Sequence, residues 1–312
     1  MRFLRLMSVI TPDVMTDADG RSGSAASGLP PATRVGRVRL QVADLDRSLP
    51  FYTGVLGFRV IRRAGDVAVL GARWDSNALV ELHARRGARR PPPRARFGLY
   101  HAAVLLPARA ALARFAAHLA EQGVAAGSAD HAVSEAIYLT DPDGLGIEVY
   151  ADRPRSAWRV HEGELVMNTQ PLDVDSLLAD AGDGGWSGLP AGTSIGHLHL
   201  RVGSLEQAAA FYGRALGFDT TVRSYPGALF FSAGGYHHHL GTNTWAAAGA
   251  VAPADEDARL IEWELVLPTP SDVWTTARRV EAAGYSLVSA GDDRLLADPW
   301  GTALRLTARS LA

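Results

Sequence analysis

The chain of 312 residues contains no cysteine. Disulfide bonds, thiolate metal sites and a cysteine nucleophile are therefore excluded, and any metal must be held by His, Asp, Glu, Tyr or backbone oxygens. No apolar run reaches the roughly 18 residues that a membrane-spanning helix needs, so we predict no membrane partner. The net charge of −2 gives no electrostatic case for a nucleic-acid partner. A Gly-rich phosphate loop and a GxSxG nucleophile motif are also missing.

The first 32 residues differ in composition from the rest of the chain. The opening stretch, MRFLRLMSVI, is basic and briefly apolar, but Pro12 and Asp13 interrupt it before it reaches the length of a secretory signal. Residues 16–33 are rich in Gly, Ser, Ala and Pro, a composition typical of a flexible segment. We therefore predict a disordered leader over residues 1–32 and a cytoplasmic protein.

An internal repeat determines the predicted architecture. Residues 36–58 read GRVRLQVADLDRSLPFYTGVLGF, and residues 196–218 read GHLHLRVGSLEQAAAFYGRALGF. At a constant offset of 160, nine of these 23 positions are identical, which is far above chance for unrelated segments. The chain therefore contains at least two copies of one structural unit.

Each copy predicts a strand followed by a helix. Apolar and polar residues alternate over residues 38–42, which is the period of a strand. Asp44 and Ser204 are suitable N-cap residues, and apolar residues then recur at helical spacing. Gly57 and Gly217 stand where the C-terminus of a helix favours a residue in the left-handed conformation.

A weaker pair of similar segments adds two more units. YHAAVLLP (100–107) is similar to IEWELVLP (261–268), and each is followed by a predicted helix, an Asp-Pro-x-Gly turn and a final strand. The sequence thus predicts an α+β fold of four tandem βαβββ modules in two pairs. The region 153–192 contains the stretch DAGDGGWSGLPAG, which indicates a linker.

Three stretches narrow the comparison with known families: GLYHAAVLLP (98–107), DHAVSEAIYLTDPDGLGIEVYADRPR (130–155) and GGYHHHLGTNTW (234–245). Together with the four-module layout, they resemble the vicinal oxygen chelate superfamily of glyoxalases, bleomycin-resistance proteins and extradiol dioxygenases. The resemblance covers residues 33–308, and the stretches look like those of two-domain bacterial proteins of the catechol 2,3-dioxygenase type.

The resemblance implies paired modules that form open, mixed-sheet barrels, each able to cup a metal. We expect modules 1 and 2 to form one domain at residues 33–152, and modules 3 and 4 to form a second at residues 193–308. The linker at 153–192 would join them. Metal ligands would stand on the first and last strands of the modules.

In the second domain, the positions that the resemblance implies carry His197, His239, Glu262 and Arg305. The usual extradiol pattern has His in place of Glu262 and Glu in place of Arg305, so this ligand set must differ from it. We predict His197, His239 and Glu264 as the metal ligands, with Glu264 preferred because it lies further into its strand. Two imidazoles and one carboxylate form the ligand set of non-haem iron(II) oxygenases.

The histidine cluster of GGYHHHLGTNTW suggests which side chains face the site. On an alternating strand, His237 and His239 would share the inward face while His238 points away. The catalytic residues that we predict are His199 and Tyr236, either of which could act as a base near a substrate hydroxyl.

The first domain offers a secondary candidate metal site formed by Glu81, His101 and Glu148. A guanidinium group has no lone pair that could bind a metal, so Arg37 and Arg305 each remove one ligand position. These two lost positions favour an alternative in which the protein binds a small molecule without turnover.

We predict a metal-dependent, ring-cleaving extradiol dioxygenase that acts with O2 on a small aromatic diol of the catechol type. The resemblance implies Fe(II) as the cofactor, with Mn, Zn or Ni as alternatives. Two other functions stay open, a non-catalytic binding or resistance module and a glyoxalase-like isomerase or lyase. Either a monomer or a homo-oligomer is compatible with the sequence.

Overall fold

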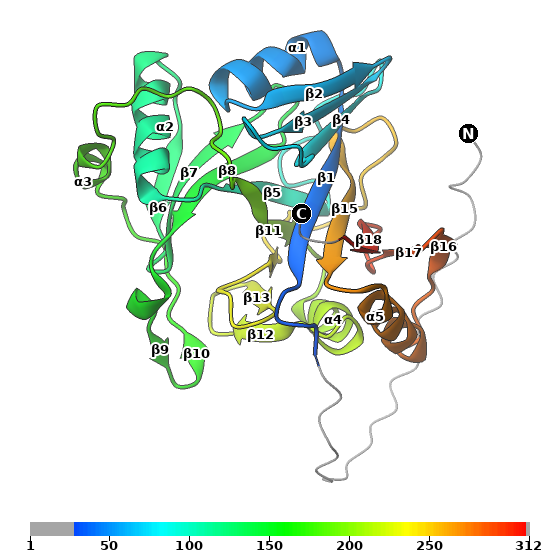
Figure 1. Ribbon diagram of the computed structural model, residues 1–312. Coiled ribbons are helices and arrows are strands. Elements are labelled where there is room, and N and C mark those ends of the chain that lie inside the picture. Colours follow the sequence, from blue (N-terminus) through cyan, green and yellow to red (C-terminus); the bar gives the residue numbers. More distant parts are fainter. Residues whose placement is uncertain (1–27, 310–312) are drawn as a thin grey trace.

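The computed structural model describes residues 28–309 of the chain, so most of the predicted leader lies outside the described residues. The described part is an α+β fold of four βαβββ modules that form two eight-stranded mixed sheets (Figure 1). The predicted fold class is therefore confirmed. None of its helices is both long and apolar enough to cross a membrane.

The first half of the chain contains modules 1 and 2. Module 1 consists of β1 (Arg34–Val42), α1 (Leu45–Pro50), η1 (Phe51–Val55), β2 (Arg59–Ala64), β3 (Val67–Gly71) and β4 (Val80–Ala84). Module 2 consists of β5 (Gly98–Leu105), α2 (Arg109–Glu121), β6 (Gly127–Asp130), β7 (Ser134–Thr140) and β8 (Gly146–Asp152).

The second half repeats this order. Module 3 consists of β11 (Ser194–Arg201), α4 (Leu205–Ala208), η3 (Ala209–Ala215), β12 (Asp219–Val222), β13 (Ala228–Ser232) and β14 (Leu240–Asn243). Module 4 consists of β15 (Arg259–Leu267), α5 (Pro270–Ala282), β16 (Val288–Ala290), β17 (Asp293–Ala297) and β18 (Ala303–Ala308).

The strand order shows which modules share a sheet. One sheet, which we call the 1–4 sheet, has the order β16-β17-β18-β15-β1-β4-β3-β2 and joins module 1 to module 4. The other, the 2–3 sheet, has the order β12-β13-β14-β11-β5-β8-β7-β6 and joins module 2 to module 3. At the centre of each sheet the first strands pair antiparallel, β1 with β15 and β5 with β11. The predicted pairing, in which residues 33–152 and 193–308 each form one barrel, is therefore wrong.

The repeat could not reveal this pairing because it identifies equivalent strands, not the neighbours that they select. Every first strand carries a similar apolar pattern, so each of them is a suitable partner for any other. The region 153–192 leads from β8 to β11, and both strands flank β5 in the same sheet. The connection therefore joins two modules within one sheet.

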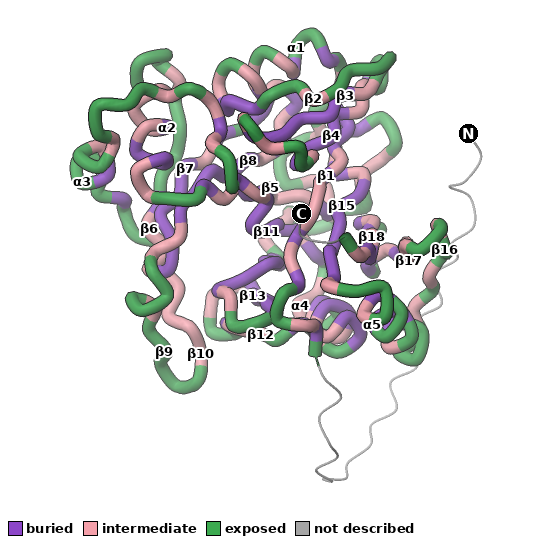
Figure 2. Tube along the Cα trace, in the orientation of Figure 1, coloured by how far each residue is buried: buried purple, intermediate pink, exposed green. Residues whose placement is uncertain are grey.

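The region predicted as a linker contains regular structure. It comprises η2 (Arg155–Ala157), the strands β9 (Val160–His161) and β10 (Glu164–Leu165), and α3 (Val174–Ala179). The β9–β10 hairpin is largely exposed and projects from the sheets, whereas the central strands are buried (Figure 2). Helix α3 packs against α2 of module 2.

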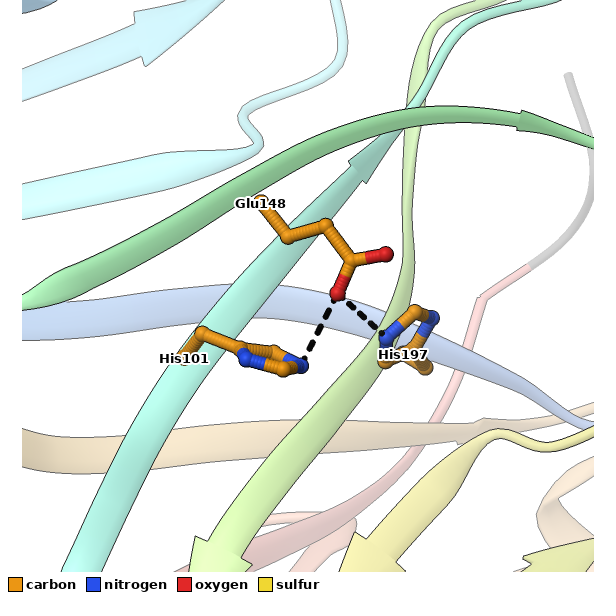
Figure 3. A group of neighbouring side chains, drawn as sticks. All are labelled: His101, Glu148 and His197. Carbon is orange, nitrogen blue, oxygen red and sulfur yellow. Dashed lines mark hydrogen bonds and ion pairs between the residues drawn. The ribbon is translucent and has the colours of Figure 1, made fainter. Parts of the chain in front are cut away.

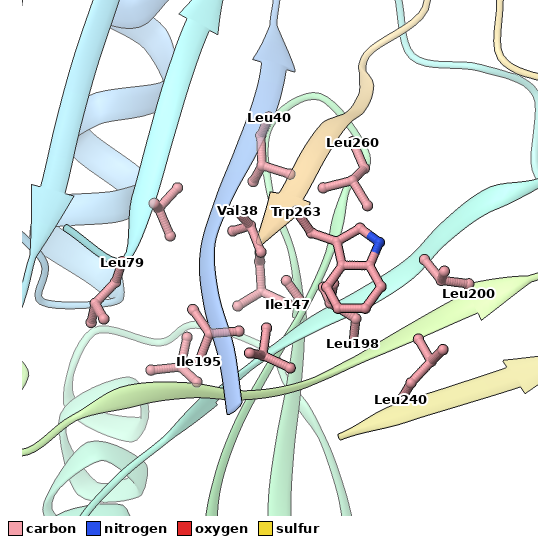
Figure 4. Packing of buried hydrophobic residues seen from close by; sticks show 14 of the residues in the cluster. Val38, Leu40, Leu79, Ile147, Ile195, Leu198, Leu200, Leu240, Leu260 and Trp263 are labelled. Atoms are coloured by element: carbon pink, nitrogen blue, oxygen red, sulfur yellow. The ribbon is translucent and has the colours of Figure 1, made fainter. Parts of the chain in front are cut away.

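A shared apolar core holds the two sheets together. The largest cluster of buried side chains includes residues from all four modules. Trp263 of β15 is fully buried in it, near Val38 of β1 and with Leu198 of β11 and Ile147 of β8 (Figure 4). Burial of apolar surface is the main favourable term in folding, so this shared core stabilises the relative position of the sheets.

The predicted helix ends are confirmed in both copies of the repeat. The Asp44 side chain accepts a hydrogen bond from the backbone of residue 46, and the Ser204 side chain accepts one from the backbone of residue 207. Gly57 and Gly217 have φ values of +83° and +90°, a conformation that strongly favours glycine.

Two buried tyrosines link successive modules. The Tyr52 hydroxyl donates to Asp141 Oδ2 at 3.1 Å, and the Tyr212 hydroxyl donates to Asp298 Oδ2 at 2.7 Å. Each tyrosine comes from the strong repeat, and each aspartate opens an Asp-Pro-x-Gly turn. Modules 1 and 2, and likewise modules 3 and 4, are thus joined by one equivalent contact although they lie in different sheets.

Candidate metal centre

Three buried side chains of the 2–3 sheet converge on one point. Glu148 Oε2 lies 2.9 Å from His101 Nε2 and 3.2 Å from His197 Nε2 (Figure 3). His101 comes from β5, Glu148 from β8 and His197 from β11. Their potential ligand atoms all lie within 4.8 Å of one another, and no other group of this kind is found in residues 28–309.

The strand register explains why these three residues meet. Ala103 of β5 lies opposite Glu148 on the parallel neighbour β8 and opposite His197 on the antiparallel neighbour β11. His101 precedes Ala103 by two positions and so projects from the same face. The small side chain of Ala103 leaves the space into which the other three side chains reach.

The charge state of these residues suits a cation. Burial alone would raise the pKa of Glu148, but His197 and His101 hold that pKa well below its usual value. Burial lowers the pKa of His197 to about 4, so its imidazole is neutral at pH 7. A neutral imidazole has a free lone pair on one ring nitrogen, which is the form that binds metals.

Two nitrogen atoms of this group have no hydrogen-bond partner. His101 Nε2, which faces Glu148, is buried without a hydrogen bond of good geometry. His197 Nδ1 is also buried without one, although the nitrogen of that ring that faces Glu148 is Nε2. Buried polar atoms normally have a partner, so orphaned atoms call for an explanation. Two imidazoles and one carboxylate aimed at a common point match the facial ligand set of non-haem iron(II) sites.

The three side chains open into a cavity of about 340 Å³. Its volume lies in the range of roughly 300–1,000 Å³ that is typical of small-molecule sites. The lining consists of Tyr100, His101, Ala129, His131, Ser134, Tyr138, Glu148, Met167, Asn168, Thr169, His197, His199, Tyr225, Phe230, His238 and Trp245. Aromatic and imidazole rings thus form most of the wall.

The structure brings together one residue of the predicted primary metal site with two of the secondary one. His197 stands beside His101 and Glu148, as described above. Glu264 lies in the other sheet, where Arg37 and Arg309 bind its carboxylate at 2.8 and 2.9 Å. The predicted set of His197, His239 and Glu264 is therefore not assembled, because module 3 pairs with module 2 rather than with module 4.

Glu81, the third member of the secondary site, is also in the 1–4 sheet. It is paired with Arg37 at 2.8 Å and with Arg39 at 3.5 Å. These ion pairs and a contact with His83 lower the pKa of its carboxyl group against the opposing effect of burial. Glu81 therefore cannot join His101 and Glu148.

The orientation predicted for the three adjacent histidines is wrong. His238 lines the cavity, whereas His239 faces the backbone, where its Nδ1 accepts from the amide of Ala233 at 3.2 Å. The reason is that residues 236–239 form the connection between β13 and β14, so strand alternation does not apply to them. Burial lowers the pKa of His239 to about 3, which keeps it neutral.

The two predicted catalytic residues have different surroundings. His199 lines the cavity, and its Nε2 is buried without a hydrogen-bond partner. Burial and the neighbouring His101 lower its pKa well below the usual value. Tyr236 is absent from the lining. Its hydroxyl lies 2.8 Å from that of Tyr150 and 3.2 Å from Asp152, and burial raises its pKa well above the usual value.

Sequence reasoning missed Tyr138. Tyr138 of β7 lies opposite Glu148 in an antiparallel pair, so both side chains share the face that lines the cavity. The Tyr138 hydroxyl is 2.6 Å from His131 Nε2, and His131 Nδ1 is 2.8 Å from the carbonyl oxygen of Asn168. The signal available in the sequence was the alternation of AIYLT, which places Tyr138 on the inward face of its strand.

The comparisons with known proteins agree with this architecture. The model of the Glyoxalase/Bleomycin resistance protein/Dioxygenase superfamily matches residues 34–149 and 194–304. A protein of Bacillus subtilis (strain 168) named catechol-2,3-dioxygenase is 46% identical over 270 residues, which cover 86% of this chain and 94% of that relative.

Two solved structures share the fold at low sequence identity. A protein from Bacillus subtilis subsp. subtilis str. 168 aligns with a TM-score of 0.60 and 12% identity over 91% of this chain and 86% of that one. Glyoxalase I from Zea mays aligns with a TM-score of 0.52 and 17% identity over 88% and 92% of the two chains. The resemblance seen in the sequence is therefore confirmed, and the chain belongs to the Glyoxalase/Bleomycin resistance protein/Dioxygenase superfamily.

Proposed function

We propose that this protein is a metal-dependent extradiol dioxygenase that cleaves the aromatic ring of a catechol with O2. The observation that carries the proposal is the buried group of His101, Glu148 and His197, which opens into an aromatic cavity. The 46% identity to a catechol-2,3-dioxygenase over most of both chains supports the same reaction. Arg37 and Arg305, which favoured a non-catalytic binder, lie in the other sheet and take no ligand position from this group.

His101, Glu148 and His197 would hold the metal, and iron(II) is the ion that we propose. This ligand set suits iron(II) oxygenases because it leaves positions open for substrate and oxygen, while Mn, Zn and Ni remain the alternatives. When bound, iron(II) supplies the redox chemistry with O2 and the affinity for the two diol oxygens. The chain itself supplies the orientation of the substrate and the transfer of protons.

His238 is placed to accept a proton from the diol. Its ring lies 4.1 Å from that of His197, centroid to centroid, and its Nδ1 is 2.6 Å from Nδ1 of His237. Burial and the neighbouring His197 lower its pKa well below the usual value, so the ring is neutral and can act as a base. His199 is the second neutral imidazole in the wall.

A chain of hydrogen bonds selects the tautomer of His238. His237 Nε2 donates to Asp152 Oδ1 at 2.8 Å, because a carboxylate only accepts. With its proton on Nε2, His237 accepts at Nδ1 from His238 Nδ1, which leaves the lone pair of His238 on Nε2. Asp152 therefore sets the tautomer of His238 through His237, without contacting His238 itself.

Tyr138 is placed to bind a substrate oxygen. Burial and the charge of Glu148 raise the pKa of Tyr138 well above the usual value, so it keeps its proton. The carbonyl of Asn168 accepts from His131 Nδ1, so with its proton on Nδ1 the imidazole accepts at Nε2 from the Tyr138 hydroxyl. The phenol oxygen is thereby held at the cavity wall with a lone pair toward the substrate.

The test is oxygen consumption by the full chain loaded anaerobically with iron(II) and then given catechol. We expect oxygen uptake and a yellow ring-cleavage product, which an isomerase or a passive binder would not give. His238→Ala should lower kcat by about 100-fold or more, the usual contribution of a general acid or base. His239→Ala is the matched control and should retain activity and metal. A folded, iron-loaded protein that consumes no oxygen with any catechol would refute the proposal.

A further inference from the structure

The connection between modules 2 and 3 forms one wall of the cavity. Met167, Asn168 and Thr169 follow the β9–β10 hairpin and all line it. The next residue, Gln170, exchanges two backbone hydrogen bonds of 2.9 Å with Asp130 of module 2. This segment is therefore a built part of the site.

The same segment is also attached to module 3. Thr169 Oγ1 lies 2.8 Å from the Tyr225 hydroxyl. Upstream, Glu164 Oε2 accepts two backbone hydrogen bonds of 3.0 Å from residues 223 and 224. Contacts on both sides fix the position of the wall across the cavity.

This wall completes an apolar region beside the histidines. Met167 packs against a cluster that contains Phe230, Tyr225 and Trp245. Phe230 in turn contacts the rings of His238 and His199, with centroids 4.9 and 5.7 Å apart. A catechol whose diol faces the triad would direct its ring substituent toward these apolar side chains.

The cavity has room for such a substituent. An unsubstituted catechol has eight heavy atoms, and even at the liquid volume of a water molecule for each atom it would occupy only about 240 Å³. The cavity volume is about 340 Å³. The cavity therefore has room for a ring with an added alkyl, chloro or similar group.

Within residues 28–309, the lining contains no arginine or lysine that could pair with an anionic substituent, and its one carboxylate is Glu148. Arg201 does not itself line the cavity. Its guanidinium lies 4.9 Å from the centroid of the Tyr100 ring and donates to the Leu99 carbonyl at 2.8 Å. A substrate carboxylate in the apolar region would be buried without a cationic partner, which is unfavourable.

We propose that the protein acts on catechols with an uncharged, apolar ring substituent and discriminates against carboxylated catechols, with Met167 as a specificity-determining residue. This inference rests on the proposed function, because it concerns the substrate of the same site. A part of region 153–192, which the sequence indicated as a linker, thereby acquires a role in substrate selectivity.

The test compares 4-methylcatechol with 3,4-dihydroxybenzoate, which differ by a methyl and a carboxylate at one ring position. Anaerobic titration calorimetry of the iron-loaded full chain gives both dissociation constants without turnover. We expect the carboxylate to bind about 100-fold more weakly, as an unpaired buried charge requires. Equal or tighter binding of 3,4-dihydroxybenzoate would overturn the inference.

The calorimetric result is independent of the proposed reaction. Selective binding of 4-methylcatechol without later oxygen uptake would refute the dioxygenase proposal and support the selectivity. Oxygen uptake with 3,4-dihydroxybenzoate as the better substrate would refute the selectivity and support the reaction.

Variants of the connecting segment test the role of Met167. Met167→Arg should reduce the preference for the methyl ligand by about tenfold or more, because it supplies a cation next to the substituent. Val160→Arg is the matched control on the same segment, where Val160 is 68% exposed on the hairpin, and it should leave the preference unchanged. An unchanged preference in Met167→Arg would overturn the assignment.

Met167→Ala keeps the test informative if the arginine variant fails to fold. This change adds no charge, so the ratio of the methyl to the carboxylate ligand should stay the same. The larger apolar region should favour 4-phenylcatechol relative to 4-methylcatechol. An unchanged ratio of 4-phenylcatechol to 4-methylcatechol binding in Met167→Ala would overturn the assignment of Met167.

Discussion

The two sheets have the same strand register but carry opposite chemistry at equivalent positions. His197, His101 and Glu148 of the 2–3 sheet correspond to Arg37, Glu262 and Arg305 of the 1–4 sheet. In the first set, two imidazole nitrogens are buried without hydrogen-bond partners. In the second set, Arg305 Nε and Nη2 bind the two oxygens of Glu262 at 2.8 and 3.1 Å.

The ion pairs of the 1–4 sheet form a closed, balanced network. Four guanidinium groups face four carboxylates, those of Arg37, Arg39, Arg305 and Arg309 and those of Glu81, Glu262, Glu264 and Asp293. The charges cancel, and guanidinium groups have no lone pair to offer a metal. One backbone arrangement thus carries a candidate metal centre in the 2–3 sheet and a salt-bridge cluster in the 1–4 sheet, and the side chains at equivalent positions account for the difference.

The largest expected effect comes from a glutamate-to-glutamine change in the 2–3 sheet. Glu148→Gln removes the only carboxylate of the proposed metal centre, so metal affinity should fall by more than the roughly 100-fold that changes outside the ligand set produce. Oxygen uptake should fall with it. Metal content after gel filtration, measured by atomic spectroscopy, checks the prediction.

The matched control is Glu262→Gln in the 1–4 sheet. It removes one carboxylate charge at a position equivalent to His101 and should leave the metal content unchanged. If Glu262→Gln lost the metal and Glu148→Gln kept it, the metal centre would belong to the 1–4 sheet and not to the 2–3 sheet.

Part of the fold and part of the candidate site could be predicted from the sequence alone. The repeat correctly predicted the helix caps at Asp44 and Ser204 and the left-handed glycines that follow, because these depend on neighbours close in sequence. The family resemblance implied metal ligands on the first and last strands of the modules, and His101, Glu148 and His197 were all among the candidates.

What failed depends on contacts between distant segments. Glu264 was chosen on the assumption that module 3 pairs with module 4, and strand pairing is not encoded in a local pattern. His239 was preferred to His238 because strand alternation was extended into residues 236–239, which lie in the connection between β13 and β14. Tyr138 was overlooked because its value comes from its position opposite Glu148.

A second prediction uses one substitution at equivalent positions of the two sheets. Arg37→Met leaves the buried Glu264 and Glu81 short of a partner, since the Arg37 side chain is only 16% exposed. We expect the free energy of unfolding to fall by about 3 kcal/mol, the usual cost of breaking a buried pair. Urea unfolding followed by circular dichroism measures it, and metal binding should persist.

His197→Met is the counterpart in the 2–3 sheet. It should abolish metal retention, while the stability of the metal-free protein changes little, because a neutral imidazole is replaced by an apolar side chain of similar size. A variant of Arg37 that loses the metal, or a variant of His197 that keeps it, would contradict the assignment of roles.

A smaller effect is expected from Asp152→Asn, which acts only in the 2–3 sheet. The amide can donate to His237 Nε2, which reverses the tautomer of His237 and removes the acceptor for His238 Nδ1. We expect kcat to fall by about tenfold with KM and metal content unchanged. Tyr236→Phe is the control, because it removes the other hydrogen bond to Asp152 at 3.2 Å and leaves the tautomers in place. Equal losses in both variants would indicate that Asp152 has only a structural role.

The smallest effect concerns a feature that the two halves share. Tyr52→Phe and Tyr212→Phe each remove the hydroxyl that donates to a buried aspartate, Asp141 or Asp298. Each aspartate keeps two backbone hydrogen bonds, so we expect a loss of only about 1–2 kcal/mol in unfolding free energy per variant. Denaturant unfolding at pH 7.5 should give similar values for both, with metal content unaffected.

The loss of unfolding free energy in Tyr52→Phe should depend on pH. Burial raises the pKa of Asp141 to about 6, above the usual value of 3.8, so the folded state binds the proton more tightly than the unfolded state. This aspartate therefore favours folding most below pH 3.8, and that contribution is lost as the pH rises through 6. The Tyr52 hydroxyl lowers this pKa by stabilising the charged form, so its removal should cost more at pH 7.5 than at pH 5. A cost that does not change with pH would mean that the hydroxyl binds both forms of the carboxyl group equally well.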